Sequence, residues 1–336
     1  MWEKMHILII GVGSIGERHL RNFLRISGVS CSVAEVNPGT LKKITSQYSV
    51  KHAYADYREA DLNAFDGVVI CIPANLHIPV TMEMVKAGKH VLLEKPLAMS
   101  MEGVDELKKL NATGKTVLCV GYNYRSDPLF RELRDRVLAG DAGSICLVNY
   151  YVGQYWPQMR KDYPPQYAQS RDTGGGAIPD HLIHMINFLE WCFGPPLEVS
   201  ACQWRLGLTD VATEDTANVV LKFKGGMVAF LGICLFQRDN RMSLQIIGET
   251  STIQFNGGKN HLEIFNTAAS IWMKGTNHAV DRDTVFMYQA QHFIDCIRGK
   301  DNPRCTLEEA EQTLKTMLAA LQSSDSDSRF IMTGVK

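Results

Sequence analysis

Residues 5–20, MHILIIGVGSIGERHL, decide the fold of the first part of the chain. A run of aliphatic residues leads directly into three glycines, Gly11, Gly13 and Gly16, and then into a helical pattern. Between a strand and a helix, a GxGxxG turn brings bare backbone N–H groups and a helix N-terminus against a pyrophosphate. Such glycines are also used simply to make tight turns, so the motif alone is weak evidence. In this context it predicts a dinucleotide phosphate site formed by Gly11, Gly13, Ser14, Ile15 and Gly16.

An acidic residue at the end of the second aliphatic run strengthens this prediction. Glu35 closes the segment CSVAEV, residues 31–36, at the spacing from which a carboxylate reaches the adenosine ribose. A 2′-phosphate would meet like charge there, and residues 36–38 supply no arginine, so the sequence favours NAD over NADP. The alternative is a strand-end glutamate that only meets solvent.

The pattern of aliphatic runs divides the chain into two parts. From Met5 to about Gly121, short aliphatic runs alternate with helical patterns, as in a doubly wound α/β domain whose parallel strands are covered on both faces. After Gly143, longer alternating segments separated by hairpin signals at residues 224–226 and 256–258 predict a large, open, mainly antiparallel sheet.

Three helical patterns accompany the second part, at residues 181–193, 285–299 and 307–324. We therefore predict a Rossmann NAD-binding domain over residues 1–124. An α+β domain for substrate binding and oligomerisation is predicted over residues 125–336.

Composition limits the classes of partner. Of the 336 residues, 45% are hydrophobic, and the net charge is −1. This balance does not favour binding to nucleic acid or to an anionic membrane surface, so we expect a small-molecule partner. Met1 is followed almost at once by the first aliphatic run, and the longest apolar run, at about residues 227–236, is too short to span a bilayer. We expect a cytoplasmic protein. Nine cysteines without a CxxC motif, mostly within apolar runs, predict no disulfide and no cysteine-bound metal.

Residues 90–98, HVLLEKPLA, place a carboxylate and an amine where an aliphatic strand should end. In open parallel sheets, ligands bind at the carboxyl ends of the strands, so Glu94 and Lys95 are expected to face the cofactor. Pro96 cannot donate to the ladder and holds Lys95 in extended geometry, which would direct the amine across the crevice. The alternative is a surface lysine at the end of a strand.

Taken together, these motifs resemble the Gfo/Idh/MocA family, the glucose-fructose oxidoreductase and inositol dehydrogenase type. The resemblance covers essentially the whole chain, through GVGSIGERHL (11–20), IPANLHIPVTMEMVKAGKHVLLEKPLA (72–98), GYNYR (121–125), GGGAIPDHLIH (174–184) and PRCTLEEAEQTLKTMLAALQSS (303–324). It implies a Rossmann domain followed by an α+β domain with an open sheet, in agreement with the pattern above.

The resemblance also implies roles for individual residues. Lys95 would lie near the nicotinamide and the reacting carbinol, Asp180 would contact substrate and orient the site, and His184 would accept the proton. The cofactor would also contact Pro73, Asn75 and His77 in the loop after the third major strand, and Asn123 after the last Rossmann strand. Glu94, at the strand end before Lys95, is expected to face the cofactor as well.

The chemistry of this set is consistent with alcohol oxidation. Loss of hydride from a carbinol carbon requires a group that takes the hydroxyl proton, and a neutral imidazole can do so near pH 7. Asp180 and His184 are four residues apart on a predicted helix, so a surface hydrogen bond or helix capping by Asp180 is the alternative. No metal is expected, because Asp180, His181 and His184 have no evident further ligands and no HExxH pattern is present.

Departures from the family pattern concern the substrate. Leu182 stands where the family commonly has glycine, and Asn187 where an acidic residue is often found, so the pocket floor is expected to differ. Residues 152–176 are rich in Tyr, Trp and Arg, similar to members encoded with bacterial surface-sugar pathways, although such residues also serve ordinary packing. The substrate candidates are Arg125, Tyr155, Arg160, Tyr163, Tyr167, Arg171 and His181.

The resulting functional hypothesis is an NAD-dependent dehydrogenase acting on a secondary alcohol of a sugar, polyol or sugar derivative. One alternative is a non-catalytic NAD-binding regulator on the same fold. Another is an enzyme that uses NAD transiently for sugar epimerisation or glycoside cleavage. A homodimer or homotetramer formed through the open sheet is expected, because the alternating strands carry too many apolar residues to remain exposed.

Overall fold

The computed structural model describes residues 4–159, 169–257 and 259–334. The chain forms two compact units, one of Met1–Ser126 with Asp281–Glu311 and the other of Asp127–Val280 with Gln312–Lys336. The structure thus groups residues 281–311 with the first unit, whereas the sequence prediction had assigned them to the second domain.

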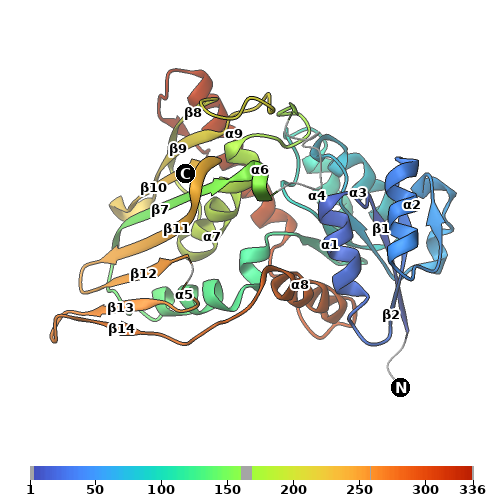
Figure 1. The fold of residues 1–336 in the computed structure, drawn as a ribbon, viewed down its shortest axis with the longest axis horizontal. Helices are drawn as coiled ribbons and strands as arrows, with labels where there is room; N and C mark the ends of the chain where they lie inside the picture. The colour runs from blue at the N-terminus through green and yellow to red at the C-terminus, as the bar shows by residue number, and fades with distance from the viewer. Residues whose placement is uncertain (1–3, 160–168, 258, 335–336) are drawn as a thin grey trace. The chain divides into compact units, whose positions relative to one another are not determined.

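The first unit is a Rossmann fold, as predicted (Figure 1). Its six strands pair in parallel in the order β3-β2-β1-β4-β5-β6. They are β1 (Met5–Ile10), β2 (Val29–Ala34), β3 (Ala53–Tyr54), β4 (Gly67–Ile70), β5 (His90–Leu93) and β6 (Leu118–Val120). The helices are α1 (Ser14–Phe23), α2 (Pro38–Gln47), α3 (His77–Lys86), α4 (Val104–Asn111) and α8 (Arg282–Ile297), with 3-10 turns η1 (Tyr57–Glu59), η2 (Leu62–Ala64), η3 (Ala74–Leu76) and η4 (Asn123–Ser126).

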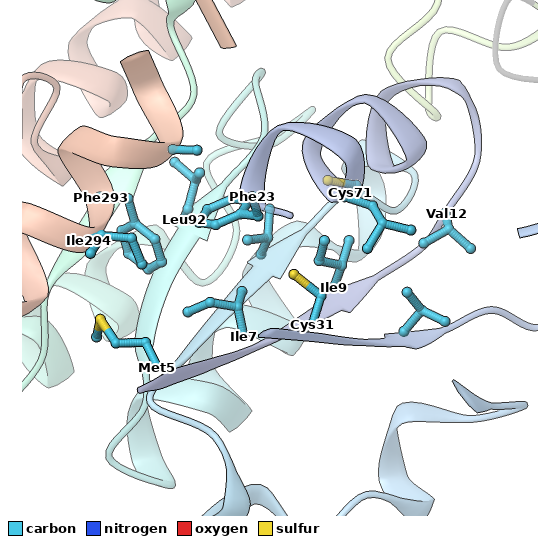
Figure 2. Close-up of a cluster of buried hydrophobic side chains, with 14 of the residues drawn as sticks. Met5, Ile7, Ile9, Val12, Phe23, Cys31, Cys71, Leu92, Phe293 and Ile294 are labelled. Atoms are coloured by element: carbon cyan, nitrogen blue, oxygen red, sulfur yellow. The ribbon is translucent and has the colours of Figure 1, made fainter. Parts of the chain in front are cut away.

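Helix α8 belongs to this unit because its side chains complete the core. Figure 2 shows Phe293 and Ile294 of α8 in the same buried cluster as Ile7 of β1 and Phe23 of α1. All four side chains have no exposed surface, and the rings of Phe23 and Phe293 meet edge to face with centroids 6.3 Å apart. Full burial of an aromatic or aliphatic side chain of this size contributes about 1.5–3 kcal/mol. The late segment is therefore an integral part of the Rossmann unit.

The second unit is built on a nine-stranded sheet of order β14-β13-β12-β11-β7-β10-β9-β8-β15. All its pairs are antiparallel except β7 with β10, so the prediction of a mainly antiparallel sheet is confirmed. The strands are β7 (Ile145–Tyr155), β8 (Glu198–Trp204), β9 (Thr216–Lys222), β10 (Val228–Cys234), β11 (Phe236–Gly248), β12 (Thr252–Asn256), β13 (Glu263–Asn266), β14 (Ile271–Lys274) and β15 (Ile331–Met332). The helical segments are α5 (Pro128–Leu138), α6 (Trp156–Met159), η6 (Ile178–Leu182), α7 (Ile183–Phe193), η7 (Lys224–Gly226) and α9 (Leu307–Asp325), whose first residues belong to the first unit.

The two faces of this sheet differ in burial. Side chains alternate along each strand, and the positions that include Val148, Tyr150 and Leu231 are buried. On the other face, the side chains of Phe230 and Tyr151 are 47% and 36% exposed. This alternation produces one core face and one open face with large aromatic groups on it.

Candidate active site

The GxGxxG turn has little room for side chains except above its middle glycine. Gly11 has a φ of +82°, and a Cβ there would lie 2.7 Å from the carbonyl oxygen of Cys71. A Cβ on Gly16 would lie 1.9 Å from the carbonyl oxygen of Gly11. A Cβ on Gly13, by contrast, would have no atom within 4 Å, and Gly13 precedes α1 without a side-chain cap. The N-terminus of α1 is therefore bare, in the way that a pyrophosphate requires.

The carboxylate of Glu35 is fixed beside this turn. Its Oε2 accepts the backbone N–H of Val12 at 2.9 Å, and its Oε1 accepts the backbone N–H of Asn37 at 2.8 Å. Each carboxylate oxygen can accept more than one hydrogen bond, so both can still accept from a ribose hydroxyl. The residues present thus fit an adenosine diphosphate group bound as in other Rossmann domains.

Glu94 and Lys95 follow directly after the last residue of β5, as the sequence predicted. Lys95 is half-buried, and its peptide bond to Pro96 is cis. Glu94 is only 5% exposed, however, and its Oε1 lies 2.6 Å from Nε2 of the buried His19. Its Oε2 accepts the backbone N–H of Lys95 at 3.1 Å. Both oxygens of the Glu94 carboxylate therefore have hydrogen-bond partners within the protein, whereas the sequence interpretation had placed this carboxylate against the cofactor.

The loop before α3 is held to the Lys95 turn by His77. This imidazole is 1% exposed, with Nδ1 2.7 Å from the carbonyl oxygen of Pro96 and Nε2 2.9 Å from that of Ile72. Burial lowers the pKa of His77, against the opposing effect of the two carbonyl groups. A neutral imidazole has only one N–H, and the shorter contact, from Nδ1 to the carbonyl oxygen of Pro96, favours the donor there. His77 thus links the loop before α3 to the Lys95 turn, and its expected contact with the cofactor stays a prediction. Pro73 and Asn75 of the same loop are exposed.

The stretch after β6 contains one expected ligand group and one structural arginine. The Oδ1 of Asn123 is buried and, in the described part of the chain, has no hydrogen-bond partner, as an atom awaiting a ligand would. Arg125 is 2% exposed and donates from Nη1 to the carbonyl oxygen of Arg304 at 2.5 Å and to Oε1 of Glu309 at 2.6 Å. Arg125 therefore anchors η4 to the start of α9, and its expected contact with substrate stays a prediction.

Asp180 and His181 lie in a π-helical turn, η6, and His184 lies in the first turn of α7. The predicted α-helical spacing of Asp180 and His184 does not hold, because their segment begins with this wider turn. Nδ1 of His181 lies 3.0 Å from the amide nitrogen of Gln154, which can only donate, so His181 carries its proton on Nε2. That Nε2 lies 3.1 Å from Oδ2 of Asp180. Asp180 and His181 are thus brought together, and π-helical turns often occur at functional sites.

The other substrate candidates differ from expectation where they are described. Tyr155 follows Gln154 in β7 and so points to the opposite face of the sheet, where the guanidinium of Arg238 lies 3.9 Å from its ring centroid. Arg171 forms ion pairs with Glu214 and, at 3.2 Å, with Asp325. Both side chains already have protein partners. Arg160, Tyr163 and Tyr167 lie outside the described residues.

Asn187 does not form part of an open pocket floor. It is 1% exposed, and its amide donates to the hydroxyl of Thr313 on α9 at 2.9 Å. The substitution relative to the family pattern is thus accommodated between two helices of the second unit. The expected effect of Asn187 on the pocket floor is not supported by this position.

Sequence interpretation missed a buried cluster in the first unit. The side chains of Cys119, His292 and Cys296 come within 4.8 Å of one another through their sulfur and nitrogen atoms. A hydrogen bond from the Cys119 thiol, with a further contribution from His292, lowers the pKa of Cys296. Nε2 of His292 accepts the backbone N–H of Arg304 at 3.1 Å, and Nδ1 lies 3.1 Å from Oδ2 of Asp301. Because both ring nitrogens have protein partners, this cluster is a hydrogen-bonded set with no imidazole lone pair left for a metal.

A doubly wound sheet, a bare helix N-terminus and a fixed strand-end glutamate define a dinucleotide-binding protein of the Rossmann class. The chain belongs to the Gfo/Idh/MocA family: residues 5–122 match the oxidoreductase family's NAD-binding Rossmann fold, and residues 130–254 match the GFO/IDH/MocA C-terminal domain. It is therefore an oxidoreductase with an NAD-binding domain, and the predicted cofactor class is confirmed.

Several characterised proteins are similar to this chain. It is 25% identical to a myo-inositol 2-dehydrogenase of Thermotoga maritima, over 95% of this chain and 96% of that protein. It is 30% identical to a 4-carboxy-2-hydroxymuconate-6-semialdehyde dehydrogenase of a Sphingobium strain, over 68% of this chain and 71% of that protein. Levoglucosan dehydrogenase in complex with NADH and levoglucosan has the same fold, with a TM-score of 0.85 at 18% identity, over 98% of this chain and 100% of that one.

The described helices do not include a candidate membrane span. None of them is both long enough and apolar enough to cross a bilayer.

Proposed function

We propose that this protein is an NAD-dependent dehydrogenase that transfers hydride between a secondary alcohol of a sugar, polyol or sugar derivative and the nicotinamide. The observation that carries this proposal is the position of Lys95. It stands at the carboxyl end of β5, in the same unit as the bare N-terminus of α1, and its backbone N–H is bonded to Glu94. A lysine placed there suits stabilisation of negative charge on a reacting oxygen.

The residues that would hold NAD lie in the first unit. The backbone of the turn from Gly11 to Gly16 would receive the pyrophosphate, and Glu35 the adenosine ribose. Asn123 offers the buried acceptor Oδ1 to the same ligand. When bound, NAD⁺ supplies the acceptor for the hydride.

Acid–base roles are assigned to Lys95, Asp180 and His184. Lys95 would stabilise the alkoxide that develops as the carbinol loses its proton, and His184 would take that proton. Asp180 would orient the substrate. His181, whose Nδ1 is hydrogen-bonded to Gln154 of β7, has its Nε2 3.1 Å from Oδ2 of Asp180 without a hydrogen bond between them. We propose that this close approach, in place of direct substrate contact, positions the Asp180 carboxylate.

The substrate class is supported by the named relatives. One acts on myo-inositol, a polyol, and a protein of the same fold was crystallised with levoglucosan. Another is named for a carboxylated semialdehyde, which makes that class the second candidate.

Two other functions remain to be separated from this one. A non-catalytic NAD-binding regulator would show no turnover with any substrate. An enzyme that uses NAD transiently would form product without net NADH.

The test is a screen of polyols, sugars, sugar nucleotides and carboxylated aldehydes for NADH formation, with NADP in parallel and product detected independently by chromatography. The proposal expects NADH formed in proportion to oxidised product with at least one polyol or sugar. Formation of product without net NADH would contradict this proposal and indicate an enzyme that uses NAD transiently. Binding of NAD without formation of any product would indicate a non-catalytic regulator.

A further inference from the structure

We propose that His19 and Glu94 are positioning residues that connect the dinucleotide-binding helix α1 to the backbone of Lys95. The inference deepens the proposed function and rests on it, because it concerns how the lysine of that reaction is held. Neither His19 nor the carboxylate of Glu94 would touch substrate.

The first link is a buried hydrogen bond between α1 and the end of β5. His19 lies in the middle of α1 with no exposed surface, and its Nε2 is 2.6 Å from Oε1 of Glu94. A carboxylate can only accept, so the proton is on Nε2. Nδ1 of His19 is buried without a hydrogen-bond partner in the described part of the chain, and the ring meets Phe286 edge to face at 5.3 Å.

The second link runs from the same carboxylate to the lysine. Oε2 of Glu94 accepts the backbone N–H of Lys95 at 3.1 Å. The carboxylate is also enclosed from β6, since a Cβ on Gly121 would lie 3.1 Å from Oε1 and 3.2 Å from the carbonyl oxygen of Leu93. A rotated carboxylate therefore has little space on that side.

The opposite end of the turn is fixed independently. Nδ1 of His77 lies 2.7 Å from the carbonyl oxygen of Pro96, the residue after Lys95. The lysine backbone is thus held on its N-terminal side by Glu94 and on its C-terminal side by His77. A shift of a catalytic group by about 1 Å costs on the order of a hundredfold in rate, so the His19–Glu94 bond should matter for turnover more than for NADH binding.

The chain allows variants that separate positioning from stability. His19→Gln keeps an N–H donor near the place of Nε2, whereas His19→Leu removes the donor and leaves the buried carboxylate unpaired. The double variant His19→Leu/Glu94→Met removes both polar groups, which is often neutral for stability. Glu311→Gln is the matched control, because Glu311 is also 5% exposed and is paired with Lys108 at 2.6 Å, outside the proposed site.

Three quantities should be measured on each full-length variant: kcat, the Kd for NADH, and the hydrogen exchange rate of the Lys95 amide without substrate. His19→Leu and the double variant should lose about tenfold to a hundredfold in kcat while the Kd for NADH stays within about threefold. Both should exchange the Lys95 amide faster than wild type. His19→Gln should have a kcat within about threefold of wild type. Glu311→Gln should change neither kcat nor the hydrogen exchange rate of the Lys95 amide.

A double variant that unfolds at the wild-type temperature and retains wild-type kcat would overturn the inference. So would unchanged protection of the Lys95 amide in that variant. The exchange measurement needs no substrate, so it judges the inference even if wild type proves inactive, a result that would instead defeat the proposed function.

Discussion

At the scale of single residues, Glu35 shows how a motif residue is put in place. The sequence predicted its role from its position at the end of a strand, and the structure adds two backbone N–H groups that fix the carboxylate. That position presents negative charge where the ribose of a Rossmann-bound dinucleotide lies. Discrimination against a 2′-phosphate follows from this charge.

Glu35→Ala should therefore weaken NADH binding by about tenfold or more, since a charged group loses its hydrogen bonds to the ribose. The affinity for NADPH should change less, so the difference between the dissociation constants for NADH and NADPH should become smaller. Fluorescence titration with both cofactors checks this, with the exposed Glu59→Ala as control. Tighter binding of NADPH than of NADH by wild type would show that the assignment of Glu35 is wrong.

Other residues could not be predicted because their partners are distant in the sequence. Arg125 was expected at the substrate, yet its guanidinium bonds to Glu309, 184 residues later. Glu94 was expected at the cofactor, yet it pairs with His19, 75 residues earlier. A motif locates such residues at a strand end, but the direction of a buried polar side chain depends on which distant group forms a hydrogen bond with it.

At the scale of elements, periodicity identified most helices but not what they pack against. The apolar pattern of α8 was evident, whereas its place against α1 depends on side chains that are complementary only in space, such as Phe23 and Phe293. Helix α5 was not predicted. Its N-terminal signal is nevertheless recognisable, because Pro128 follows Asp127, whose side chain accepts the backbone N–H of Leu129. We have no sequence signal for the π-helical turn at Asp180.

Asp283 should stabilise the contact between α8 and α1. It accepts from Nε and Nη2 of Arg21 at 2.6 and 2.8 Å and lies 3.0 Å from Nε of Arg18. The hydrogen bond from Arg21, opposed by burial and helped by the charges of both arginines, holds the pKa of Asp283 below its ordinary value of 3.8. A lowered carboxyl pKa contributes stability that is complete above the ordinary value and is lost as the pH falls through the folded value.

Asp283→Asn should therefore lower the free energy of unfolding at pH 7 by about 1 kcal/mol, a modest amount because the side chain is partly exposed to solvent. The difference from wild type should persist down to about pH 4 and shrink below it, as the wild-type carboxyl becomes protonated. Urea unfolding across this range measures it, with Asp135→Asn, whose side chain is 75% exposed, as control. A difference that grew with acidification would contradict this explanation.

At the scale of the whole molecule, the fold class was predictable, and so was a boundary near residue 125, whereas the place of residues 281–311 in the first unit was not. Short continuous aliphatic runs predicted the parallel sheet, and alternating hydrophobicity predicted the antiparallel one. No local sequence pattern indicates that residues 281–311 belong to the first unit. The open face of the second sheet, with Phe230 and Tyr151 on it, motivates our proposal that the protein is a homodimer or homotetramer.

Phe230→Glu should shift this assembly toward the monomer, because a charge buried in an apolar interface is not compensated. Light scattering at micromolar concentration measures the change, and Leu138→Glu, at an exposed position on α5, is the control. Wild type that scattered as a monomer of 37.6 kDa would refute the oligomer.

The measurement that tests the central claim most directly is the comparison of kcat with NADH affinity in Lys95→Met, using a substrate found by the screen. Methionine keeps an unbranched side chain and removes the charge that would stabilise the developing alkoxide. We predict a loss in kcat of about a hundredfold to ten-thousandfold, with the Kd for NADH unchanged within about tenfold. A variant with near-wild-type kcat would show that Lys95 takes no part in the chemical step.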